Sequence, residues 1–150
     1  MNLTKADVAR LGRRAQQPVK EPGEILAVFV AGPVTNPLNG SLSRAHWTKK
    51  SRWAKDWRER TQMVLLEAIQ ALPFGLLPCD KAAPKCIEFT VHLVRRMDDD
   101  NLAASVKPCR DALRDMRVIH DDDPESGHLF RYRQTNESGK RGVEIRVSPR

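Results

Sequence analysis

The chain has 150 residues and a formal net charge of +7, with 26 Lys and Arg against 19 Asp and Glu. Its 40% hydrophobic and 30% charged residues exclude a disordered chain and suit a single domain with its own core. The excess of basic residues favours a polyanionic partner, because Lys and Arg displace counterions from phosphates. A basic surface that contacts only solvent is the alternative that charge by itself leaves open.

No apolar run is as long as the roughly 18 residues of a membrane span, so no membrane partner is expected. Residues 2–14 also lack the apolar core of a signal peptide. The three cysteines, Cys79, Cys86 and Cys109, are odd in number and have no C-x-x-C spacing. We therefore expect reduced thiols, a cytoplasmic location and no zinc site.

Residues 1–24 are predicted to form an N-terminal arm outside the domain that spans residues 25–150. Thr4 could cap a short helix that ends near Arg14, and a Pro- and Gly-rich linker follows it. A frayed arm is the simpler interpretation of such a terminus. The domain then begins with residues 25–30, a continuous apolar run that predicts a buried strand.

A long helix is predicted from residue 48 to residue 72, where the following Pro73 stops it. Its apolar residues recur at spacings of three and four and so share one face. The chain before the helix and its first half are strongly basic; this surface is a candidate for phosphate contact, and a solvated face is equally compatible. The residues of this face are Trp53, Trp57, Thr61, Val64, Leu65, Ala68 and Leu72. The candidate DNA-binding residues are Arg44, Lys49, Lys50, Arg52 and Lys55, with Arg95 and Arg96 further along the chain.

A second strand is predicted at residues 87–94, where every other residue is apolar and His92 lies on the opposite face. Residues 101–116 carry one apolar stripe and are predicted to form a single helix, in which Pro108 causes a kink or marks a tightened early turn. Two further strands, at 129–135 and 142–147, are predicted to pair as a hairpin. The order β-α-β-α-β-β indicates an α+β fold of a single domain, in which one mixed sheet packs against two main helices.

Six carboxylates of this basic protein lie in two short clusters, Asp98–Asp100 and Asp121–Asp123. Carboxylates so close repel one another unless a cation neutralises them, so a shared divalent metal is the simplest interpretation. If the strand continues through the first cluster, Asp98 and Asp100 point the same way and could share one ion. Carboxylate oxygens without histidine favour Mg²⁺, with Mn²⁺ as a substitute. Helix capping explains one aspartate and not three; an acidic turn without a ligand is the remaining alternative.

Three motif segments surround these clusters: Asp98-x-Asp100-Asn101-Leu102, Lys107-x-x-x-Asp111-Ala112-Leu113 and Asp121-Asp122. In this order they resemble the RusA-type Holliday-junction resolvases, small endonucleases associated with phages and prophages. The resemblance covers roughly residues 25–147. It implies a RusA-like fold, a homodimer, and two sites that cut opposed strands of a four-way junction and leave 5′-phosphate ends.

The resemblance also assigns roles to individual residues. It implies that Asp98, Asp100 and Asp122 are the catalytic, metal-binding carboxylates, with Asp121 as a supporting ligand. Lys107 matches the family's catalytic lysine, a cation that stabilises the phosphate or the transition state.

The position of Lys107 departs from the family pattern. The family lysine falls three residues after the asparagine, whereas Lys107 falls six after Asn101. Arg95, Arg96 or Arg110 could supply the cation instead.

The residues and the resemblance together predict a Mg²⁺-dependent endodeoxyribonuclease that hydrolyses phosphodiester bonds in branched DNA during recombination and repair. The alternative is a protein of the same fold that binds junction or duplex DNA without cutting it. Such a protein would shift junction DNA in a gel but never cut it in any divalent metal, whereas the nuclease requires the aspartates of both clusters to meet around a common ion.

Overall fold

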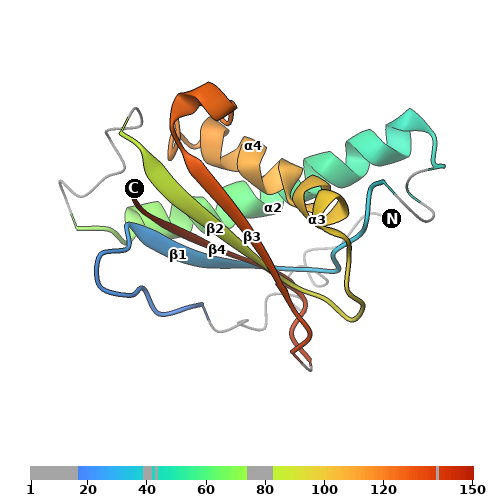
Figure 1. Cartoon of the computed structure of the whole chain (residues 1–150), viewed down its shortest axis with the longest axis horizontal. Helices are drawn as coiled ribbons and strands as arrows, with labels where there is room; N and C mark the ends of the chain where they lie inside the picture. The colour runs from blue at the N-terminus through green and yellow to red at the C-terminus, as the bar shows by residue number, and fades with distance from the viewer. Residues whose placement is uncertain (1–16, 39–41, 43, 74–82, 138) are drawn as a thin grey trace.

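The described helices lie on one face of a four-stranded sheet (Figure 1). The computed structural model describes residues 17–38, 42, 44–73, 83–137 and 139–150, so the helix expected near the N-terminus lies outside the described residues. The predicted α+β fold with one mixed sheet is confirmed. Along the chain the elements are β1 (Leu26–Ala31), α2 (Trp47–Gln70), β2 (Lys85–His92), α3 (Asp99–Ser105), α4 (Lys107–Asp115), the 3₁₀ helix η1 (Pro124–Ser126), β3 (Leu129–Thr135) and β4 (Gly142–Pro149).

The order of strands in the sheet differs from their order along the chain. The strands lie in the order β1-β4-β2-β3, with β2 antiparallel to β4 and parallel to β3. The hairpin predicted for residues 129–135 and 142–147 is therefore wrong, because β2 lies between these two strands. β2 is one of the two interior strands, and a neighbour on each side removes more of its apolar surface from water. Its Ile87 and Phe89 are fully buried. The segment 136–141 then has to cross over the end of β2.

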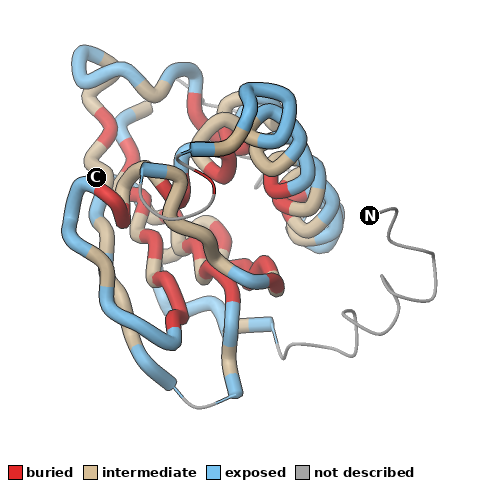
Figure 2. Tube along the Cα trace, turned by 90° about the vertical axis from the view of Figure 1, so that its right-hand side faces the viewer, coloured by how far each residue is buried: buried red, intermediate tan, exposed pale blue. Residues whose placement is uncertain are grey.

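The core forms where one face of the sheet meets the helices (Figure 2). The register aligns apolar residues in rows, so that Val28, Ile145 and Phe89 lie side by side on β1, β4 and β2. Each of the three is at most 1% exposed. The next row carries polar residues such as Glu144 and Thr90 on the opposite face, which is the alternation expected of a sheet with one covered face.

α2 confirms the predicted long helix and its apolar face. Trp57, Thr61 and Leu65 are buried on this face, and no helix among the described residues is both long and apolar enough to cross a membrane. The outer side of α2 is tied to α4 by Arg58, whose guanidinium makes two hydrogen bonds to Asp115. One of them joins Arg58 Nη2 to Asp115 Oδ1 at 2.7 Å. The two helices therefore meet through both apolar packing and a bidentate ion pair.

Two helices, α3 and α4, replace the single helix predicted for residues 101–116. Val106 separates them with φ −101° and ψ 2°, and Pro108 lies in the first turn of α4. Proline has no N–H to donate and clashes with the carbonyl four residues earlier, so it starts a helix more readily than it continues one. The apolar stripe is confirmed, because Leu102 and Leu113 are buried. Only the continuity of the backbone between them was wrongly predicted.

His92 lies on the sheet face opposite the core, as predicted, yet it is only 4% exposed. The segment that crosses from β3 to β4 covers it. Glu137 Oε2 lies 3.7 Å from His92 Nδ1, and Lys140 Nζ lies 4.9 Å from the ring centroid of the neighbouring Phe29. Burial and the charge of Lys140 lower the pKa of His92. The imidazole is therefore a buried, neutral group at the end of β2.

Candidate active site

The first acidic cluster forms the start of α3. Asp98 is the capping residue, with φ −70° and ψ 157°, and Asp99 and Asp100 lie in the first turn. Successive helix residues are rotated by about 100°, so the strand alternation that predicted a common direction for Asp98 and Asp100 does not apply. All three side chains are exposed, and within the described part of the chain none has a hydrogen bond or ion pair. The cluster therefore presents uncommitted carboxylate oxygens.

The second acidic cluster follows a reversal of the chain after α4. Arg117 adopts a left-handed conformation with φ 59°, and the N–H of Val118 donates to the carbonyl of Leu113. The chain then returns along α4 and places Asp122 beside the side chains of that helix. The second and third motif segments thereby come together.

Three cationic side chains of α4 converge on Asp122. Lys107 Nζ lies 2.5 Å from Asp122 Oδ2, and Arg114 Nη1 lies 3.1 Å from Oδ1. Arg110 Nη2 donates to the Asp122 carbonyl at 2.8 Å and lies 3.5 Å from Oδ2. Lys107 also contacts Asp111 Oδ1 at 2.8 Å. Because the Asp122 side chain is only 10% exposed, these cations are its main source of charge compensation.

The charges and hydrogen bonds around Asp122 and Lys107 favour the ionised form of each side chain. Burial by itself would raise the pKa of Asp122, but the hydrogen bond from Lys107 and the charges of the three cations outweigh it and lower the pKa. Burial likewise opposes the charged form of Lys107, yet its hydrogen bonds to Asp111 and Asp122 raise its pKa. Both groups are therefore ionised at neutral pH and hold the loop against α4.

The neighbours of Asp122 have local roles. Asp121 Oδ1 accepts the N–H of Asp122 at 2.7 Å. Asp123 Oδ1 accepts the N–H of Glu125 at 3.1 Å and so caps η1. Capping therefore accounts for Asp123, whereas Asp121 is exposed and stays compatible with a supporting role.

Replacing Asp122 by asparagine is expected to lower the free energy of unfolding by about 1–2 kcal/mol at neutral pH, after allowance for solvent screening of the half-exposed Lys107. The pKa of Asp122 is lowered from 3.8 in the folded state, so its stabilisation is present above that pH and is lost as the pH falls below it. Urea unfolding at about pH 7 and about pH 3 measures the difference between wild type and variant. Asp121→Asn keeps the turn hydrogen bond and is the matched control. A difference that does not shrink in acid would contradict the ion-pair account.

The carboxylates that could bind a metal ion differ in whether their oxygens already accept hydrogen bonds. Among the described residues, no three His, Cys, Asp or Glu side chains lie close enough together to hold an ion as they stand. The exposed, uncommitted oxygens of Asp98 and Asp100 nevertheless suit a hard divalent cation. The oxygens of Asp122 already accept bonds from Lys107 and Arg114. A metal ion at Asp122 would therefore have to replace the Lys107 ammonium group.

The break between α3 and α4 explains how Lys107 reaches Asp122. In one continuous helix, the three extra residues before Lys107 would turn its side chain by about 300° from the family position. Lys107 instead begins a new helix, whose first turn faces the returning loop. Of the alternative cations, Arg110 shares this site, whereas Arg95 and Arg96 precede α3 and lie at its other end.

Apart from Arg95 and Arg96, the basic residues predicted to bind DNA lie before α2 and along its N-terminal half, which extends past α3 (Figure 1). Lys50 is half-buried, and Lys55 pairs with Glu59 at 3.7 Å. The sequence reasoning missed Trp47 at the start of α2, which is 70% exposed. Its place outside the apolar period that includes Trp53 is the signal that could have marked it. The exposed basic residues of this region are Arg44, Lys49, Arg52 and Lys55.

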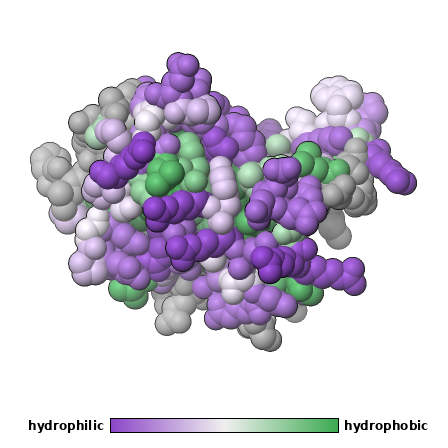
Figure 3. Space-filling model, viewed as in Figure 1, coloured by the Kyte–Doolittle hydropathy of each residue, from purple (hydrophilic) through white to green (hydrophobic). Residues whose placement is uncertain are grey.

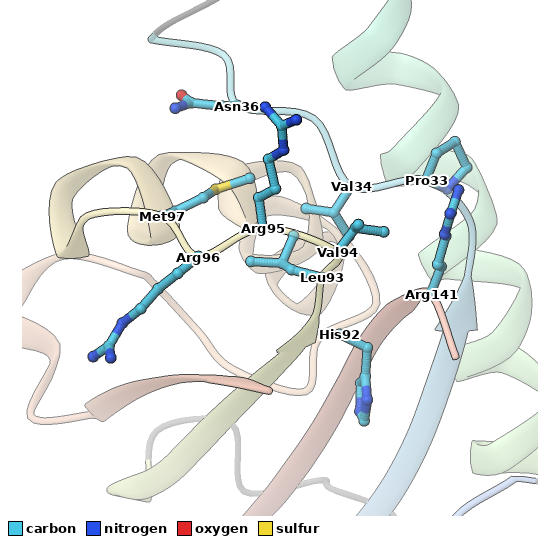
Figure 4. Close-up of a pocket in the computed structure, with 10 residues that line it drawn as sticks. All are labelled: Pro33, Val34, Asn36, His92, Leu93, Val94, Arg95, Arg96, Met97 and Arg141. Atoms are coloured by element: carbon cyan, nitrogen blue, oxygen red, sulfur yellow. The ribbon is translucent and has the colours of Figure 1, made fainter. Parts of the chain in front are cut away.

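Arg95 and Arg96 border a pocket of about 380 Å³ that adjoins the first acidic cluster. Arg95 reaches toward Asn36, Arg141 stands beside Pro33 on the other side, and Arg96 points away from both (Figure 4). Hydrophilic side chains cover most of the face seen in Figure 1, with apolar patches between them (Figure 3). A site at the start of α3 is thus flanked by exposed arginines.

No protein-family model matches the chain, and a search of curated proteins finds no match either. The resemblance to the RusA-type resolvases therefore depends on the three motif segments. The second and third meet through Lys107 and Asp122, and the first lies at the other end of the short helix α3.

Proposed function

We propose that this protein is a Mg²⁺-dependent endodeoxyribonuclease that hydrolyses phosphodiester bonds in branched DNA such as Holliday junctions. The observation that carries the proposal is the contact between Lys107 and Asp122, which lie 15 positions apart in the sequence and which the motif assigns to one catalytic site. The seven residues of α3 link Asp98 to this pair. The net charge of +7 supports attraction to DNA.

The residues at the two ends of α3 would divide the chemistry between them. Asp98 and Asp100 would hold Mg²⁺ or Mn²⁺, with Asp122 and Asp121 as further oxygen donors. Such an ion, when bound, supplies Lewis acidity that polarises the scissile phosphate and favours deprotonation of the attacking water. Lys107, held in its charged form by neighbouring carboxylates, would offset the negative charge that develops on the phosphate.

The basic surface would seat the DNA. The N-terminal half of α2, together with Arg95 and Arg96, offers cations to the phosphate backbone, and such contacts position a duplex without reading its bases. We further propose a homodimer, as the resemblance implies, so that two sites cut opposed strands of one junction. Light scattering of the protein with and without junction DNA measures that stoichiometry.

A non-catalytic DNA-binding protein of the same fold is the second candidate. It is favoured by the three cations that already surround Asp122. It is also favoured because no ready-made group of three metal ligands occurs within the described ranges. In such a protein the Lys107–Asp122 contact would serve stability alone.

A synthetic four-way junction separates the two candidates. We expect the labelled junction to be cut when Mg²⁺ is present and to stay intact in EDTA, because only the metal-loaded carboxylates can activate water. Linear duplex of the same sequence is the matched substrate and should be cut more slowly. A protein that shifts the junction in a gel but never cuts it, in Mg²⁺ or Mn²⁺, would be the binding protein instead.

A further inference from the structure

The pocket drawn in Figure 4 lies where three chain segments meet at one end of the sheet. Residues 33–36 follow β1, residues 92–97 comprise the end of β2 and the segment after it, and Arg141 precedes β4. Its volume of about 380 Å³ lies in the range of roughly 300–1,000 Å³ found for ligand sites. Met97, the last lining residue of the second segment, directly precedes Asp98, so the pocket adjoins the acidic cluster.

The pocket combines an apolar floor with a cationic rim. Val34 and Val94 lie between Arg95 and Arg141 in Figure 4, and Val94 is 60% exposed although it is apolar. Neither guanidinium has a carboxylate partner in the part of the chain that the structure describes. Exposed apolar surface beside unpaired positive charge suits a ligand with a flat apolar body and an anionic group.

His92 belongs to the lining, but its ring points away from Val34 and Val94 (Figure 4). It is only 4% exposed, and neither ring nitrogen has a hydrogen-bond partner in the described structure. Its Nδ1 lies 3.7 Å from Glu137 Oε2, which is too long for a hydrogen bond. Buried polar atoms normally have partners, but both nitrogens are shielded inside the protein. The contacts that the pocket offers to a ligand therefore come from its valines and arginines.

We propose that this pocket binds one unstacked nucleotide of a DNA strand. The base would lie on Val34 and Val94, and its phosphate would face Arg95 and Arg141. A nucleotide carries the two features that the pocket offers to a ligand, a flat face and an anionic group. The inference rests on the proposed function in that DNA is the ligand, but it does not require cleavage. A nucleotide held there would fix the strand beside Asp98 and so position the adjacent phosphate.

Fluorescence of 2-aminopurine tests the pocket without any cleavage. The full-length protein is titrated into a single-stranded tetranucleotide that contains one 2-aminopurine, in EDTA and at about 150 mM KCl, which weakens non-specific phosphate contacts. We expect saturable binding with a change in 2-aminopurine emission. Val94→Asp and Arg141→Gln should each weaken it about tenfold, whereas the exposed Val19→Asp and Arg131→Gln, which lie outside the pocket, should not. The melting temperature of each variant is measured to check that it folds. We expect it to stay close to that of the wild type, because Val94 and Arg141 are exposed.

The outcomes separate this inference from the proposed function. If neither Val94→Asp nor Arg141→Gln weakens binding, the pocket does not bind the nucleotide, even if the protein cuts the junction. A tetranucleotide with an abasic site in place of 2-aminopurine should bind about tenfold more weakly; equal binding would overturn the role of the base. Pocket-dependent binding by a protein that cuts no junction in Mg²⁺ would support the pocket and refute only the nuclease.

Discussion

Replacing Asp100 by asparagine is expected to lower the rate of junction cleavage by roughly 10²- to 10³-fold, the loss typical when one electrostatic group of an active site is removed. Asp100 lies in the first turn of α3, is exposed and has no partner among the described residues. The substitution therefore removes one oxygen of the proposed metal site and little else. Single-turnover cleavage at saturating Mg²⁺ measures the rate, and the melting temperature should stay close to wild type.

Asp99→Asn is the matched control for that experiment. Asp99 has the same charge, lies in the same helical turn and is also exposed, but the motif gives it no ligand role. We expect it to retain most of the activity. Equal losses in both variants would show that negative charge at the start of α3, and not coordination by Asp100, matters. Full activity of Asp100→Asn would remove its assigned role.

Gly142→Ala is expected to lower the free energy of unfolding by roughly 3 kcal/mol, the largest effect on stability that we foresee. Gly142 begins β4 with φ 150°, and a Cβ there would meet the carbonyl oxygen of Val30 and lie 2.7 Å from Phe29 Cζ. Backbone cannot move aside as a flexible side chain can. The crossing segment that covers His92 would be displaced with it, because Gly142 pairs with His92 in the sheet.

Gly139→Ala measures backbone strain by itself, so the difference between the two variants gives the steric part of the effect. Gly139 also has a positive φ, 79°, but its Cβ position has no heavy atom within 4 Å among the described residues that are not its chain neighbours. Only backbone strain should then be felt, roughly 1–2 kcal/mol. Urea unfolding followed by tryptophan fluorescence compares the two variants. If both lose the same stability, the close approach of β1 and β4 at Gly142 is not what requires glycine.

The sequence by itself determined most of the elements and the faces that they bury. The alternation in β2 and the three-and-four spacing in α2 are local signals, since a strand or helix that packs on one side shows its period in its own residues. The same holds for the apolar stripe of α3 and α4, which survives the break at Pro108. The acidic clusters, Lys107 and the basic start of α2 were likewise recognisable as a pattern.

Tertiary structure alone decided which of these segments became neighbours. No local signal shows that β2 separates β3 from β4, because strand pairing depends on burial summed over the whole sheet. Its consequence, the crossing segment, buries His92 and brings Arg141 to the pocket. The left-handed turn at Arg117 returns Asp122 to Lys107, and the same contact gives Asp122 cations where a metal ion was expected. Residue spacing cannot reveal that Lys107 contacts Asp122, because this contact depends on the direction in which the loop leaves α4.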